Sequence, residues 1–96
     1  MPSLADIQRD YRAAFLRYLP RREEAALRAG YELGRAAVHD GVSVLELAQM
    51  HHDVLVGVLA NTSPTDVADV ATGASEFFLE VLATFDMAQR ALHERP

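Results

Sequence analysis

The stretch SPTDVADVATGASEFFLEVLATFDMAQRALH, residues 63–93, decides the fold. Ser63 is a favourable N-cap, Pro64 suits the first helical position, and Asp66 would lie near the positive end of the helix dipole. Apolar residues then recur every three or four positions, which predicts one helix over residues 64–93. Such a helix is roughly 45 Å long, whereas a compact chain of this size has a radius of gyration of about 12–13 Å. We therefore expect its end to overhang a monomeric bundle or to pack on another subunit.

A capping signal and a proline delimit the first helix. Ser3 followed by Asp6 predicts a helix start, and apolar residues recur at steps of three and four after it. Pro20 lacks the N–H that a helix interior needs, and it disfavours helical geometry at Leu19. The expected helix therefore covers residues 4–19.

Two further helices are predicted, over residues 22–40 and 44–60. The first ends at Gly41, because glycine is common just past a helix C-terminus, and the second begins with the capping pair Ser43 and Glu46. The loops between the four predicted helices are short, which favours antiparallel neighbours in a bundle. The expected fold class is all-α, a four-helix bundle-like single domain over residues 1–96.

Composition narrows the class of ligand. The 96-residue chain has a net charge of −5 and no cysteine, so neither disulfides nor a thiolate-bound metal are available, which suits a cytoplasmic protein. The amphipathic pattern argues against a transmembrane span and a signal peptide. Between residues 36 and 89 the chain has eight acidic residues and no lysine or arginine. This part argues against a nucleic-acid ligand and favours a basic partner.

One cluster, His51-His52-Asp53, could suggest metal binding or acid–base chemistry. Adjacent residues of a helix point about 100° apart, and no His, Glu or Asp lies four positions from either histidine, so the spacing does not fit a metal site. His51 falls on the apolar face, where a hydrogen-bonded core or interface histidine is the expected role. The sequence has no phosphate-binding loop and no nucleophile elbow. We therefore expect no catalytic residue, no metal and no cofactor.

A leucine on a polar helix face is the first candidate for partner binding. Leu79 falls between Glu76 and Glu80 on the polar side of the fourth predicted helix. A single exposed leucine is ordinary, but an apolar anchor with an acidic rim is typical of protein contacts. The charge run at the start of the second helix is an alternative surface, although acids there also suit the helix dipole. The candidate partner-binding residues are Glu76, Phe78, Leu79, Glu80, Leu82, Glu24 and Arg28.

The second predicted helix contains the signal for self-association. It has two adjacent apolar stripes and two glycines four positions apart, each of which costs roughly 0.8–1 kcal/mol of helix propensity relative to alanine. Something is therefore expected to approach this helix closely. Together with the overlong fourth helix, this predicts a homodimer. The expected interface residues are Leu27, Gly30, Tyr31, Gly34 and Val38.

Three stretches resemble the N-terminal domain of RsbU-type phosphatases, the PP2C-like serine phosphatases that activate bacterial general stress responses. The first comprises YRAAFLRYL at 11–19 and AGYELGRA at 29–36, the second is GVSVLELAQMHHDVL at 41–55, and the third is EFFLEVLATFDM at 76–87. Order, spacing and length agree from about Leu4 to Leu92.

This resemblance implies a four-helix domain that dimerises and recruits a switch-kinase protein of the RsbT type, whose binding turns on a phosphatase domain further along the chain. The 96 residues themselves contain no phosphatase. Two alternatives remain at this point. One is a purely structural dimerisation domain of a sensor kinase or another signalling protein, and the other is a small-ligand sensor with a pocket near His51 and Tyr31.

Overall fold

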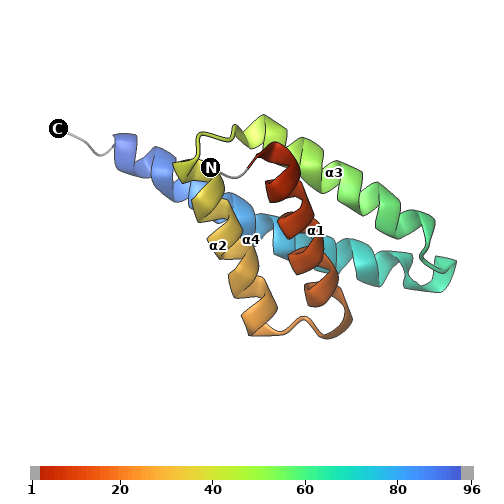
Figure 1. The fold of residues 1–96 in the computed structure, drawn as a ribbon. Coiled ribbons are helices and arrows are strands. Elements are labelled where there is room, and N and C mark those ends of the chain that lie inside the picture. The colour runs from red at the N-terminus through yellow and green to blue at the C-terminus, as the bar shows by residue number, and fades with distance from the viewer. Residues whose placement is uncertain (1–2, 94–96) are drawn as a thin grey trace.

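The computed structural model describes residues 3–93, and these residues form four α-helices and one short 3-10 helix without any strand (Figure 1). The expected all-α class is therefore confirmed. The helices form two antiparallel pairs, α1–α2 and α3–α4, which cross steeply in Figure 1. The elements are α1 Leu4–Arg21, α2 Glu24–His39, α3 Val44–Ala60, η1 Pro64–Asp66 and α4 Val67–His93.

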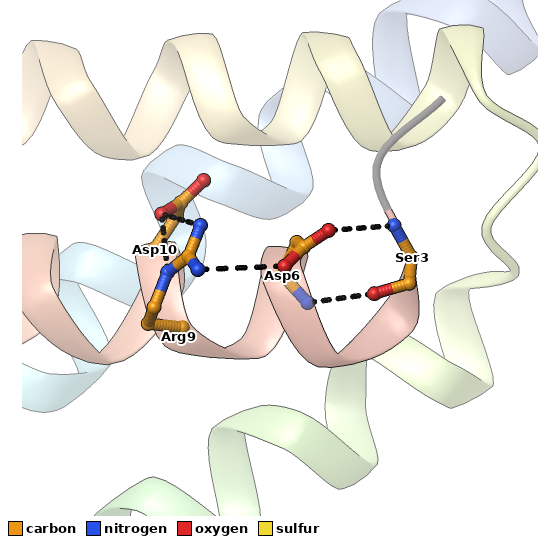
Figure 2. A network of polar contacts seen from close by, with 4 residues as sticks. All are labelled: Ser3, Asp6, Arg9 and Asp10. Atoms are coloured by element: carbon orange, nitrogen blue, oxygen red, sulfur yellow. Dashed lines mark hydrogen bonds and ion pairs between the residues drawn. The ribbon is translucent and has the colours of Figure 1, made fainter.

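Two helices begin with the predicted capping boxes. The Ser3 Oγ accepts a hydrogen bond from the Asp6 N–H at 3.2 Å, and the Ser3 N–H donates to Asp6 Oδ2 at 3.1 Å. Figure 2 shows this reciprocal pair, together with Arg9, whose guanidinium contacts both Asp6 and Asp10 at 3.4 Å. Ser43 and Glu46 make the same reciprocal pair at the start of α3. Each box satisfies backbone N–H groups that a helix start leaves unpaired.

The end of α1 differs from the prediction, because the helix continues through Pro20 to Arg21. The missing proline N–H removes one backbone hydrogen bond, and only Arg21 follows Pro20 in the helix. The helix stops instead at Arg22, which adopts left-handed geometry (φ 52°, ψ 42°) and donates its N–H to the Tyr18 carbonyl at 2.7 Å. This geometry closes a helix as a glycine would. As a result α2 begins at Glu24, two residues later than expected.

The remaining boundaries follow the predicted signals closely. Gly41 has φ 77° and donates its N–H to the Val38 carbonyl at 3.2 Å, so it ends α2 as expected. The fourth helix starts with the 3-10 turn η1 rather than with an α-helical turn, and Ser63 makes no capping hydrogen bond to the backbone. Its α-helical part, α4, has 27 residues, and Leu92 in its last turn is 64 % exposed.

The molecule is elongated because α4 is longer than the helices that cover it. Its extents are 51 × 25 × 22 Å, and its radius of gyration is 13.9 Å. The C-terminal turns of α4 extend past α2 in Figure 1. The overhang expected from the sequence is therefore present. No helix in the part of the chain that the structure describes is both long and apolar enough to cross a membrane.

An aromatic cluster forms the centre of the core. Tyr11 and Phe15 from α1 and Phe77 from α4 are fully buried, and both α1 rings meet Phe77 edge-on with centroids 5.3 and 5.6 Å away. Leu47 from α3 and Val81 from α4 complete the largest fully buried side chains. Edge-to-face contacts of this kind are favourable geometries for aromatic rings. The core thus lies where α1 and α3 meet α4.

The two glycines of α2 pack against α4 of the same chain. A Cβ atom at Gly30 would lie 2.8 Å from a ring carbon of Phe77, and one at Gly34 would lie 2.5 Å from the Val81 carbonyl oxygen. The close approach predicted for α2 is therefore real, but α4 supplies it. Both glycines are buried, so the expectation that they lie in a dimer interface is corrected. They no longer indicate a second subunit.

Candidate interaction surface on α2 and α4

Leu79 is the most exposed candidate residue of α4, with 66 % of its surface accessible. The two apolar residues predicted beside it lie elsewhere. The Phe78 ring stacks on His51 of α3 with a centroid distance of 4.0 Å. Leu82 is half-buried and lines a groove with Val42, which lies just before α3. The apolar centre of the predicted patch is therefore the single leucine Leu79.

A groove between α2 and α4 brings together residues that the sequence places far apart. Glu80, which follows Leu79 on α4, lines this groove from one side, and α2 lines it from the other. The groove has a volume of about 290 Å³. It links the two alternative partner-binding sets through one residue of the α4 set, because Glu24 and Arg28 line it together with Glu80. The lining residues are Glu24, Leu27, Arg28, Tyr31, Glu32 and Glu80. We call this set the α2–α4 groove.

The α2–α4 groove is acidic. It contains three carboxylates and one guanidinium, and no ion pair between residues 3 and 93 involves Glu24, Arg28 or Glu80. Glu32 was missed in the sequence analysis, although its spacing of four residues from Arg28 puts both on one helix face. Its carboxylate lies 3.9 Å from Arg35, in an exposed pair of little strength. These side chains can therefore pair with a partner.

Glu76, which was expected on the acidic rim around Leu79, also links α4 to the end of α1. Its Oε1 accepts a hydrogen bond from the Tyr18 hydroxyl at 3.0 Å and lies 3.4 Å from Arg22 Nη1. Arg22 Nη2 also binds the Asp69 carboxylate at 2.9 Å and the Asp69 backbone carbonyl. Burial and the Glu76 carboxylate raise the pKa of Tyr18. We call Tyr18, Arg22, Asp69 and Glu76 the Arg22 clamp, which ties the end of α1 to α4.

Arg22 was not among the residues predicted from the sequence. Its left-handed backbone places the side chain across α4 at Gly73, where a Cβ atom would lie 3.1 Å from Arg22 Nε. Only a fold in which the α1–α2 turn meets α4 gives this arginine its acidic partners. The i to i+3 and i+4 spacing rules cannot detect such a contact, because Arg22 and Asp69 are separated by 47 positions.

His51 has the structural role that its position on the apolar face predicted. Its Nδ1 atom lies 2.7 Å from the Tyr11 hydroxyl, while the neighbouring His52 is exposed. Tyr31 lies on α2 and lines two grooves, neither of which includes His51. His51 and Tyr31 therefore share neither of these grooves.

Part of the predicted dimer surface is still accessible. Leu27, Tyr31 and Val38 are half-buried along α2. Tyr31 and Val38 also line a groove of about 480 Å³ beside the exposed Met87 of α4. Gly30 and Gly34 are buried, so the flank of α2 formed by Leu27, Tyr31 and Val38 is the part of the expected dimer surface that remains accessible.

Comparison with known protein families gives a match over most of the chain. Residues 9–88 match the family described as phosphoserine phosphatase RsbU, N-terminal domain. Searches of curated proteins and of solved structures gave no match. The matched range begins within α1 and ends within α4, so it includes the core, the Arg22 clamp and the α2–α4 groove. The chain therefore belongs to the family of RsbU N-terminal domains, which is distinct from the catalytic domain of these phosphatases.

Proposed function

We propose that this chain is a non-catalytic dimerisation and partner-recruitment domain of the cytoplasm. In this proposal it binds an RsbT-like switch kinase protein and thereby activates an attached PP2C-type serine phosphatase in stress signalling. Membership of the RsbU N-terminal family supports a regulatory role. The observation that carries the recruitment step is that the exposed Leu79 immediately precedes Glu80, which lines the acidic α2–α4 groove.

Leu79 supplies the apolar part of this surface. An exposed leucine contributes little to folding, whereas its burial in a partner's pocket contributes roughly 1.5–3 kcal/mol. A leucine that stays two-thirds exposed next in sequence to a groove residue is therefore a good anchor for a second protein.

The α2–α4 groove supplies the charged part. Three carboxylates against one guanidinium favour a partner segment that presents arginine or lysine. Arg28 in the middle of the groove favours an acidic residue on the same partner segment, which would fix its register. The partner surface that fits is thus an apolar pocket next to a mainly basic segment.

We place self-association on the flank of α2 around Leu27, Tyr31 and Val38. Tyr31 belongs both to this flank and to the α2–α4 groove. Dimerisation and partner binding would therefore be adjacent on α2, so that binding at the groove can alter the arrangement of the two subunits.

Calorimetry of the chain with the RsbT-like protein from the same genome tests the recruitment step. Leu79→Ala should weaken binding about tenfold or more, which corresponds to about 1.4 kcal/mol, with little change in melting temperature. Leu45→Ala is the matched control, because Leu45 is 77 % exposed but lies on α3. It should leave the affinity unchanged.

Two outcomes would contradict the proposal in different ways. Equal affinities of the Leu79→Ala and Leu45→Ala variants would remove Leu79 from the binding surface. A chain that sediments as a dimer but binds no RsbT-like protein would favour a purely structural dimerisation domain instead.

A further inference from the structure

The helix α3 is the one least firmly attached to the rest of the molecule. Its packing on α1 and α4 is lighter than the packing of α2 on α4. Within residues 3–93, one side-chain hydrogen bond joins α3 to another helix, the bond between His51 and Tyr11. The buried residues of α3, Leu47, Met50 and Val54, pack in the apolar core. Within residues 3–93, His51 therefore makes the one side-chain hydrogen bond that attaches α3 to another helix.

Aromatic rings surround His51 on the side that faces the core. The imidazole stacks on Phe78 of α4 with an interplanar angle of 6°, and it meets Tyr11 and Phe15 of α1 edge-on at 6.0 and 5.8 Å. One side chain of α3 thus touches both α1 and α4. Any change in its charge is felt at both contacts.

A hydrogen bond in which the Tyr11 hydroxyl is the donor requires an unprotonated His51 Nδ1. Tyr11 is fully buried, and burial raises the pKa of its phenol, so the hydroxyl keeps its proton. Between residues 3 and 93 that hydroxyl has one hydrogen-bond partner, His51 Nδ1. The arrangement that satisfies both groups has the phenol donating to an unprotonated Nδ1. Protonation of Nδ1 would leave the buried phenol proton without an acceptor, which is costly.

The surroundings of His51 do not stabilise its cation. The ionisable groups that face it are Tyr11 from α1 and the neighbouring His52 on its own helix, whereas α4 offers the uncharged Phe78. Attraction between a cation and the Phe78 ring offsets part of the cost. Burial first, and the charge of His52 second, nevertheless lower the pKa of His51 below its ordinary value of 6.5.

We propose that the contact between His51 and Tyr11 is an acid-sensitive latch: protonation of His51 loosens α3 from α1 and α4, while α1, α2 and α4 stay together. We expect α1, α2 and α4 to stay together because of the contacts that join these three helices. The Arg22 clamp and the close packing at Gly30 and Gly34 contain no histidine.

The direction of the pH dependence follows from proton linkage. The unfolded chain binds the proton near pH 6.5, and the folded chain binds it only at lower pH. The stabilising contribution of the neutral latch is therefore fully present above that value. It is lost as the pH falls through the lower pKa of the folded state.

Hydrogen exchange and NMR titration of the unmodified chain test the latch. Protection factors of α3 amides should fall several-fold between about pH 7.5 and pH 5, while those of α2 and α4 change little. In the NMR titration the His51 imidazole should have a pKa below 6.5. Each pKa unit of difference corresponds to a tenfold change in the opening equilibrium.

Two variants of adjacent histidines make the test specific. His51→Gln keeps an acceptor for the Tyr11 hydroxyl but cannot titrate, so its α3 protection should be independent of pH in this range. His52→Gln is the matched control and should keep most of the fall, because burial is the larger cause of the lowered pKa.

Three results would overturn the latch. They are a His51 pKa at or above 6.5, an equal loss of protection in all four helices, and a fall in His51→Gln as large as in the unmodified chain. If His51→Gln does not fold, the titration and the exchange pattern of the unmodified chain and of His52→Gln still decide the question.

Discussion

Two helices, α2 and α3, both pack on α4, but they do so in different ways. α2 approaches the α4 backbone directly at Gly34 and the Phe77 ring of α4 at Gly30, and the nearby Arg22 clamp adds charged contacts. The one glycine of α3, Gly57, has open space around it, so no glycine brings the α3 backbone close to α1 or α4. Backbone approach leaves no room for adjustment, whereas side-chain packing can loosen one contact at a time. The domain therefore consists of a firmly packed layer of α1, α2 and α4 and a more loosely attached helix α3.

The largest effect on the free energy of unfolding is expected when one glycine of α2 and one glycine of α3 are each replaced by alanine. In Gly34→Ala the new Cβ atom must push the Val81 carbonyl away, so the free energy of unfolding should fall by about 1–3 kcal/mol. In Gly57→Ala nothing lies within 4 Å, so higher helix propensity should raise it by about 0.8–1 kcal/mol. Urea denaturation measures both changes. The two changes in the free energy of unfolding need not be equal in size. Destabilisation by Gly57→Ala would show that α3 is also closely covered.

A pair of tyrosine variants separates the two attachments. Tyr11→Phe removes the bond to His51, and Tyr18→Phe removes the bond to Glu76, so each should cost about 0.5–1.5 kcal/mol. The two variants should lose hydrogen-exchange protection in different places, because Tyr11→Phe lowers the protection of α3 and Tyr18→Phe does not. A uniform loss of protection in both variants would mean that the domain opens only as one unit.

The smallest effect is expected for the ion pairs of Arg22. Arg22 is 28 % exposed and its acidic partners are more exposed still, so Arg22→Ala should cost only about 0.5–1 kcal/mol, and less at high salt. Arg22→Gly should be the more stable of the two variants, because glycine adopts left-handed geometry without strain. Thermal unfolding at two salt concentrations measures these differences. The reverse order of stability would contradict the role of Arg22 as the end of α1.

Local signals predicted most of the fold. Ser3 with Asp6 and Ser43 with Glu46 mark helix starts at the predicted residues, and Gly41 ends α2. Pro20 misled the prediction, because its cost depends on how many backbone bonds remain after it. The site was harder to predict. Leu79 was correctly expected on an exposed face, but Phe78 and Leu82 face α3 and the groove beside it.

The sequence by itself determined the four helices and the structural role of His51, because capping, helix periodicity and turn geometry act over a few residues. The tertiary structure alone decided what the glycines of α2 contact, which acids Arg22 reaches, and that Glu24, Arg28 and Glu80 line one groove. The physical reason is that a helical pattern specifies which residues share a face, but not which helix covers that face. That choice depends on how four faces pack together at once, and no local pattern contains it.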